Sequence, residues 1–213
     1  MLDASIAQRG PDAAGRFHNH AEGVEILMLH RRLSVIDHVG GSQPMVSYVG
    51  ESPELAMVFN GCIYNNTTLR DELIGLGATF TSDHSDTETL FKAYQQWGGD
   101  CTDHLDGMYA VAIWDRRTCQ LSLFRDPYGQ KPLYILDLGE AGDGCIFCSN
   151  PEPLQTIATE LGLTNISTSA LQRYLQLGYL TSSNTLIEPV KCVGQSTPLF
   201  QPTSETIEDA IHG

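Results

Sequence analysis

The residues that decide the fold are 55–65, which read Leu55-Ala56-Met57-Val58-Phe59-Asn60-Gly61-Cys62-Ile63-Tyr64-Asn65. The first five are apolar without interruption, and such a run between polar residues is typical of a buried strand. An Asn-Gly pair follows at once, and this dipeptide is a turn signal. We therefore predict a buried strand over residues 55–59 that ends in a polar turn.

Further strands are predicted on both sides of this stretch. Residues 24–30 are apolar and are bounded by a glycine and two arginines. Residues 108–114 and 120–125 flank a short polar turn, which predicts a β-hairpin. Two shorter strands are expected over 132–136 and 145–148. Cysteines three residues apart on the last of these would face opposite sides of a strand, so we expect no metal site there.

Helices are predicted between these strands. Asn66 or Thr67 can cap a helix that ends at Gly77; its buried side would be formed by Leu69, Leu73 and Leu76. Residues 85–88, Ser-Asp-Thr-Glu, have the form of a capping box and open a second helix; its buried side would be Leu90, Phe91, Tyr94 and Trp97. Two more helices are expected near 153–161 and 167–177. Antiparallel strands with helices grouped between them indicate an α+β fold.

The charge balance limits the partners. The chain has 213 residues with 12 Lys and Arg and 26 Asp and Glu, which gives a net charge of −14. Such a surface repels nucleic acid and anionic lipid, so we expect neither as a partner. The sequence shows no apolar run of about 18 residues and no signal-peptide pattern at its start. We therefore expect a cytoplasmic protein whose six cysteines are free thiols.

Eight short segments follow one another in a characteristic order. They are Arg9-Gly10-Pro11-Asp12, residues 30–37 (His-Arg-Arg-Leu-Ser-Val-Ile-Asp), Gln43-Pro44-Met45, residues 60–65, residues 85–88, residues 105–110 (Leu-Asp-Gly-Met-Tyr-Ala), Trp114-Asp115, and residues 125–134 (Arg-Asp-Pro-Tyr-Gly-Gln-Lys-Pro-Leu-Tyr). Together they resemble class II glutamine amidotransferases, specifically the asparagine synthetase branch. The endings Ile63-Tyr64-Asn65 and Lys131-Pro132-Leu133-Tyr134 favour this branch over the purine-pathway and glucosamine-phosphate amidotransferases.

The resemblance implies an N-terminal-nucleophile hydrolase fold, a four-layer α/β/β/α sandwich of two antiparallel sheets. In that family the nucleophile is an N-terminal cysteine whose own α-amine acts as the base. Its thiolate attacks the side-chain amide of glutamine, and the released ammonia passes to a second domain that activates aspartate with ATP. The resemblance thus implies asparagine biosynthesis by a glutamine-hydrolysing ligase.

Six positions match the family's glutamine site. Arg32 matches the arginine that clamps the α-carboxylate, and Val35 matches a backbone contact. Asn60 and Gly61 match the oxyanion hole, although an Asn-Gly pair is also a common turn. Asp86 matches the carboxylate that receives the α-ammonium, although it can equally belong to a helix cap; the sixth position is Cys62.

Cys62 departs from the family, which usually has a glutamate there. A thiol is a weak hydrogen-bond acceptor. Losing a charged hydrogen bond to the ammonium costs about 1.5–3 kcal/mol, roughly tenfold to a hundredfold in affinity. Residues 1–8 resemble the end of the helix that precedes the Arg9 motif, so we expect the first strand and its nucleophilic cysteine to lie outside the 213 residues. The chain by itself is then not expected to hydrolyse glutamine.

The predicted organisation is an amidotransferase domain over residues 1–180 and a linker toward a synthetase domain over 181–213. Glutamine is the expected ligand, and a synthetase domain or subunit and a second copy of the chain are candidate partners. No cofactor is expected in this chain, because ATP and magnesium would belong to the synthetase domain. An alternative function is a non-catalytic module that binds glutamine or another protein.

Overall fold

The computed structural model describes Gly10 and residues 13–21, 23–32, 42–138, 144–180 and 185–194. The strands are β1 (Ala13–Ala21), β2 (Val24–Arg32), β3 (Met45–Val49), β4 (Ser52–Ile63), β5 (Gly107–Asp115), β6 (Gln120–Arg125), β7 (Tyr134–Asp137), β8 (Cys145–Cys148) and β9 (Val190–Cys192). The helices are α2 (Asn66–Gly75), α3 (Asp86–Trp97), η1 (Gly98–His104), α4 (Pro151–Glu160) and α5 (Thr168–Leu177).

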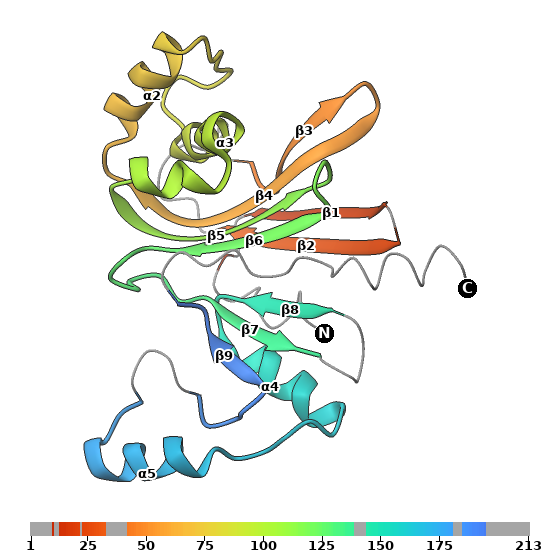
Figure 1. Cartoon of the computed structure of the whole chain (residues 1–213), viewed down its shortest axis with the longest axis vertical. Coiled ribbons are helices and arrows are strands. Elements are labelled where there is room, and N and C mark those ends of the chain that lie inside the picture. The colour runs from red at the N-terminus through yellow and green to blue at the C-terminus, as the bar shows by residue number, and fades with distance from the viewer. Residues whose placement is uncertain are drawn as a thin grey trace.

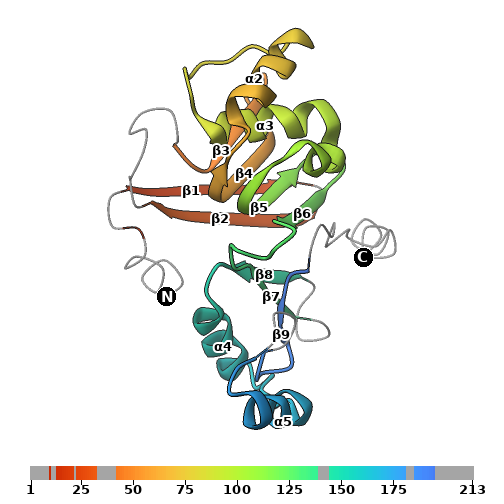
Figure 2. The same cartoon turned by 90° about the vertical axis from the view of Figure 1, so that its left-hand side faces the viewer.

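These elements stack in the order helix, sheet, sheet, helix (Figure 1). The central layer is the four-stranded antiparallel sheet β3-β4-β5-β6. Helices α2 and α3 pack on one of its faces. The other face packs on the pair β1-β2 and on the sheet β8-β7-β9, and α4 covers the outer side of that second sheet (Figure 2). The predicted α+β sandwich is thereby confirmed.

The apolar runs of β4 and β5 are explained by burial on both faces of the central sheet. Because successive side chains point to opposite faces, each strand contributes to two cores. Toward the helices point Leu55, Met57, Phe59, Tyr109, Val111 and Ile113. Toward the other sheets point Ala56, Val58, Ala110, Ala112 and Trp114. The second set includes three alanines, so the face away from the helices is lined by smaller side chains.

The strand predictions hold with one correction. The strands near residues 24–30, 108–114, 120–125 and 145–148 are present, and the strand near 132–136 begins two residues later, at Tyr134. The predicted turn at Asn60-Gly61 is wrong, because β4 continues through both residues to Ile63. They pair with Ala110 and Tyr109 of β5, and this ladder holds the backbone extended where the dipeptide alone favours a turn.

Of the two predicted N-caps one is confirmed and one is wrong, and the predicted C′ glycine of α2, Gly77, is confirmed by its positive φ after the C-cap Leu76. Ser85 caps α3 by accepting from the Glu88 amide at 3.3 Å, as the capping-box pattern indicated. Helix α2 instead follows Asn65, whose side chain makes no cap but bonds to the backbone of His104 and Asp106. Leu76, expected on the buried side of α2, is 53% exposed because the helix ends at Gly75.

Three strands were not predicted from the sequence: β1, β3 and β9. Strand β9 lies inside the segment predicted as a linker, and it pairs with β7 as an edge of the second sheet. In the described ranges, no helix is long and apolar enough to cross a membrane. The six cysteines are free thiols, as predicted. Within the described ranges, no group of His, Cys, Asp and Glu side chains is placed to hold a metal ion.

Glu88 ties the loop before α3 to the helix. Its carboxylate accepts four hydrogen bonds of 2.5 to 2.9 Å, two from Thr81 and two from Ser82. Burial opposes its ionisation, but these bonds outweigh burial and lower the pKa of Glu88. The ionised form therefore stabilises the fold above the ordinary pKa of 4.5, and this contribution is lost as the pH falls through the lowered value.

We predict that Glu88→Gln destabilises the protein by about 2 kcal/mol at neutral pH. The amide nitrogen of glutamine would replace one carboxylate oxygen, and it cannot accept the two hydrogen bonds that Thr81 or Ser82 donates to that oxygen. The difference from wild type should shrink in acid. Chemical denaturation at several pH values measures both effects. Glu160→Gln, at the exposed end of α4, is the control. A Glu88→Gln cost that stays constant down to strongly acidic pH would contradict this account.

Candidate active site

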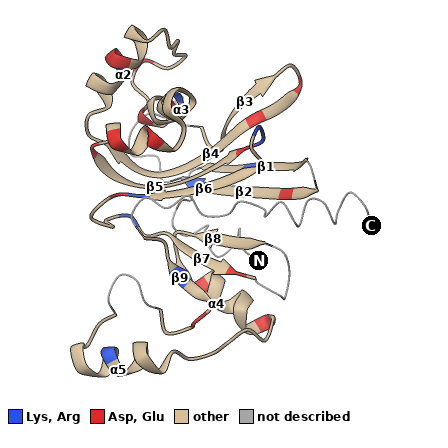
Figure 3. Cartoon of the chain, in the orientation of Figure 1, with Lys and Arg blue, Asp and Glu red and all other residues tan. Residues whose placement is uncertain are grey.

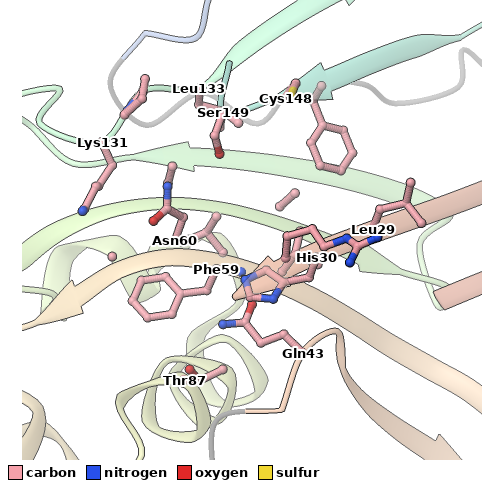
Figure 4. A pocket seen from close by; sticks show the side chains of 18 of the residues that line it. Leu29, His30, Gln43, Phe59, Asn60, Thr87, Lys131, Leu133, Cys148 and Ser149 are labelled. Atoms are coloured by element: carbon pink, nitrogen blue, oxygen red, sulfur yellow. The ribbon is translucent and has the colours of Figure 1, made fainter. Parts of the chain in front are cut away.

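A cavity of about 1310 Å³ lies between the layers. Its walls come from β2, the end of β4, the start of α3, the loop after β6, and β8. Asn60, Gly61, Cys62 and Asp86 all line it, so the structure brings four of the six predicted site residues together. Figure 4 shows the Asn60 side chain projecting into this space from β4.

The other two predicted residues cannot be placed fully. Arg32 is the last residue of β2 and pairs with Ala13 of β1, but its side chain lies outside the described part of the structure. Val35 lies entirely outside the described residues. Their assigned roles therefore remain predictions.

Gly61 directs its backbone N–H away from β5. Its partner Tyr109 uses both its N–H and its C=O on Asp126, on the far side of β5. In an antiparallel ladder Gly61 and Tyr109 therefore form a pair without mutual hydrogen bonds. The amides of Phe59 and Ile63 point the same way as that of Gly61, since this direction alternates along a strand.

These three amides form a row along the edge of β4. The Phe59 N–H donates to the Gln43 side-chain oxygen at 2.5 Å, and the Ile63 N–H donates to Asp86 Oδ2 at 3.2 Å. The Gly61 N–H between them has no partner among the described residues. An extended strand thus presents one open donor to the cavity, flanked by two satisfied ones, beside the amide side chain of Asn60. An unpaired donor of this kind can stabilise developing negative charge on a ligand oxygen.

The absence of a side chain at position 61 is a packing requirement. A Cβ atom there would lie 2.1 Å from the Met108 carbonyl oxygen and 2.8 Å from the Tyr109 Cα. Both are backbone atoms of β5, so they cannot move aside as the end of a flexible side chain could. Gly61 therefore allows the close approach that sets the position of the open amide.

Two opposite charges act on the Cys62 thiol. Burial raises the pKa of its thiol, the nearby Asp86 carboxylate raises it further, and Lys131 lowers it. The net shift is upward, so Cys62 is a neutral thiol at neutral pH and a poor nucleophile. Asp86 is the first residue of α3. Its carboxylate accepts a hydrogen bond from the backbone amide of Ile63, the residue that follows Cys62.

Two lining residues carry chemistry that the sequence did not assign. Gln43 bridges from the segment before β3 to the Phe59 amide of β4. Lys131 extends into the cavity from the loop after β6 (Figure 4). Both occur in motif segments of the sequence, so the signal was present, but position in a motif alone does not say which side chains face the ligand.

The charge of the cavity differs from that of the whole protein. Its described lining contains two acidic residues, Glu25 and Asp86, and two basic ones, Arg31 and Lys131. The whole chain has 26 acidic residues against 12 basic ones, and Figure 3 shows acidic positions scattered over α2, α3 and α4. A cavity with balanced charges suits a zwitterionic ligand better than a strongly charged one.

The cavity also lies between two sheet edges. In the part of the chain that the structure describes, β2 pairs only with β1, and β8 pairs only with β7. Residues of both strands line the cavity, with Val58, Ala110 and Ala112 of the central sheet also exposed to it. The space between β2 and β8 therefore has apolar walls and two strand edges.

An open backbone amide, an amide side chain and a carboxylate thus line one cavity between the sheets of an α/β/β/α sandwich. The family model for the glutamine amidotransferase domain matches residues 1–206, so the chain belongs to this family.

The chain resembles the asparagine synthetase members of the family. It is 36% identical over 193 residues to asparagine synthetase [glutamine-hydrolyzing] 1 of Bacillus subtilis, which covers 91% of this chain and 28% of the relative. It is 37% identical over 191 residues to a putative asparagine synthetase of Mycobacterium tuberculosis, covering 87% and 28%. The chain thus spans about 28% of the length of these relatives.

A solved structure confirms the fold. Glutamine phosphoribosylpyrophosphate amidotransferase from B. subtilis superposes with a TM-score of 0.51 at 25% identity, over 62% of this chain and 29% of that one. The N-terminal-nucleophile fold that the sequence predicted is therefore confirmed.

We predict that Gly61→Ala destabilises the protein by about 1–3 kcal/mol, since the new methyl group would push β4 away from β5. Thermal melting measures the loss. Gly75→Ala is the matched control, because a Cβ at this helical position meets nothing within 4 Å and alanine favours the helix. Equal melting temperatures for Gly61→Ala and wild type would show that the close approach is not a constraint.

Proposed function

We propose that the cavity binds glutamine and provides the oxyanion hole for hydrolysis of its side-chain amide, in an enzyme of the asparagine synthetase type. The observation that supports this most is the open Gly61 N–H on the edge of β4, between amides that Gln43 and Asp86 already satisfy. It lies next to the Asn60 side chain, and both face the same cavity as the Asp86 carboxylate.

The proposed chemistry uses these groups in defined roles. A thiolate attacks the carbonyl carbon of the side-chain amide, and the carbonyl oxygen becomes an oxyanion. The Gly61 N–H and the Asn60 amide N–H donate to that oxygen. Collapse of the intermediate expels ammonia after protonation of the amide nitrogen, and water then releases glutamate from the thioester. Asp86 holds the α-ammonium of the ligand throughout.

We infer that the attacking thiol comes with an extended strand between β2 and β8. Two strand edges face this space over an apolar floor, and such a space suits an added strand. Asn60 and Gly61 line the same cavity as residues of both strands. A strand that begins there with cysteine, as in the family, would place its thiol and α-amine at the oxyanion hole.

The ammonia would serve aspartate amidation. The relatives are named asparagine synthetases, and this chain matches 28% of their length. A synthetase domain or subunit is therefore the proposed partner, and ATP and magnesium would bind there. The chemistry proposed for this chain itself needs no metal or cofactor.

One feature favours a second reading, a module that binds glutamine without hydrolysing it. The α-ammonium side of the cavity holds Asp86 and the neutral thiol of Cys62 in place of a second carboxylate. Recognition by one carboxylate weakens binding but leaves it selective. This reading predicts binding without turnover even when a nucleophilic strand is supplied.

We predict that Asp86→Asn weakens glutamine binding about tenfold to a hundredfold, because a charged hydrogen bond to the α-ammonium is lost. Isothermal titration calorimetry measures this. The affinity for glutaramate, which lacks the α-amino group, should change little. Asp83→Asn, an exposed change in the loop before α3, is the control. Equal losses for both ligands would show that Asp86 does not contact the ammonium.

We predict that the purified 213-residue chain binds glutamine but releases glutamate no faster than a heat-inactivated sample. Cys62→Ala should leave both properties unchanged, since its raised pKa keeps the thiol protonated. An enzymatic glutamate assay tests turnover. Turnover that disappears in Cys62→Ala would make Cys62 the nucleophile and overturn the proposed role of the added strand.

A further inference from the structure

Half of the exposed large apolar side chains of the described residues lie in one short segment. Of the fourteen large hydrophobic residues that are exposed, seven fall within residues 161–179. We call them the α5 patch: Leu161, Ile166, Leu171, Tyr174, Leu175, Leu177 and Tyr179. Apolar side chains gathered in this way mark an interaction surface, whereas single exposed ones need no explanation.

Helix α5 is amphipathic, but its apolar face is open to solvent. The apolar residues of the helix share one face because they recur at intervals of three or four positions: Ala170, Leu171, Tyr174, Leu175 and Leu177. Such a face normally packs on the core of the protein. In α5 only the small Ala170 is buried, and Leu175 is 75% exposed.

The position of α5 is fixed at its beginning. The Ser167 side chain accepts from the Ala170 amide at 3.4 Å, and the Ser167 amide donates to the Leu186 carbonyl oxygen at 2.9 Å. Figures 1 and 2 both show the helix at one end of the molecule, away from the central sheet. A helix of 10 residues is marginally stable in water without tertiary packing. A partner on the open face would therefore stabilise α5 as well as cover it.

The patch is almost free of charge. Residues 161–187 contain a single charged residue, Arg173, although 18% of the whole chain is charged and its net charge is −14. Figure 3 shows the contrast between α5, which has one basic position, and the acidic positions on α2, α3 and α4. The cores of protein interfaces are likewise depleted of charged residues and enriched in aromatic ones. The composition of this segment is therefore that of an interface core.

A second copy of the chain is the partner that these charges favour. Two chains of net charge −14 repel each other, and the α5 patch is the surface where no acidic side chain of its own segment opposes their approach. A basic partner would instead be attracted to the acidic faces. In a two-fold dimer the same patch occurs on both sides, so an uncharged apolar face is complementary to itself. The segment supplies about 20 residues, close to what one side of a stable dimer interface uses.

We propose that the α5 patch joins two copies of the chain in a two-fold dimer. The residues that line the cavity include none of α5, so both cavities stay accessible in such a dimer. The dimer is independent of the proposed function, because it forms whether or not the cavity binds glutamine.

The test is sedimentation velocity of the purified 213-residue chain from about 1 to 100 μM. We expect a reversible dimer with twice the 23.3 kDa mass of one chain. Leu175→Glu should raise the dissociation constant at least about a hundredfold, because each copy brings a charge into the apolar interface. Ile74→Glu is the matched control, since it adds the same charge at a side chain of α2 that is 51% exposed and lies outside the patch. It should leave the dissociation constant within about threefold of wild type.

Two measurements on the wild type test the nature and the place of the contact. Raising the NaCl concentration from about 50 to 500 mM should tighten the dimer several-fold, because salt screens the repulsion between two acidic chains. Hydrogen exchange at the amides of α5 should slow as the protein concentration rises, and this effect should be lost in Leu175→Glu. Both wild-type results stand even where circular dichroism shows that the variant is not folded.

Three outcomes would overturn the proposal. One is a wild type that stays monomeric at the highest concentration, in which case a further domain of a longer protein becomes the candidate cover of the patch. Another is a dimer that Leu175→Glu and Ile74→Glu weaken equally, or that weakens as salt is added. The third is association that continues to larger species without a defined dimer.

Discussion

The ladder between β4 and β5 is the constraint on which the site depends. It runs in unbroken register from the pair Leu55 and Asp115 to the pair Ile63 and Gly107. Since donor direction alternates along a strand, this register decides that the Gly61 amide points outward to the cavity. A slip of one residue would turn that amide toward β5 and also exchange the two faces of β4. Gly61 and Gly107 sit where the strands come closest, so a side chain at either position would meet backbone.

The same two strands explain why a cavity exists. Larger side chains of β4 and β5 fill the core under α2 and α3, whereas Val58, Ala110 and Ala112 face the other way and line the cavity. Small residues on that face leave volume between the layers that aromatic or leucine side chains would occupy. The cavity continues between the edges of β2 and β8, where a strand could complete the layer. The large side chains on the helix-facing side of the central sheet thus pack the core that supports the site, and the small side chains on the opposite face leave room for a ligand.

How far the sequence predicted this structure depends on whether the signal was local. The buried run 55–59, the hairpin around residues 115–120 and the Ser85 cap were predictable because each is encoded within a few neighbours. The extension of β4 through Asn60-Gly61 was not, because the dipeptide favours a turn and pairing with β5 overrides it. Strands β1 and β9 lack continuous apolar runs, since β1 has charged and polar residues among its apolar ones and β9 has three residues, and the five-residue β3 was not predicted. The motifs identified four residues that meet in the cavity, but position in a motif did not show that Gln43 and Lys131 line it as well.

The position of Asp86 imposes an electrostatic condition on ligand binding. It is the first residue of α3, where the helix N-terminus carries a partial positive charge. That same partial charge disfavours an ammonium nearby by about 0.3–1 kcal/mol, whereas a charged hydrogen bond contributes about 1.5–3 kcal/mol. On these magnitudes, a hydrogen-bonded Asp86 carboxylate would outweigh the helix for an ammonium bound beside it. The described lining of the cavity, with two acidic and two basic residues, is balanced in charge within an acidic protein.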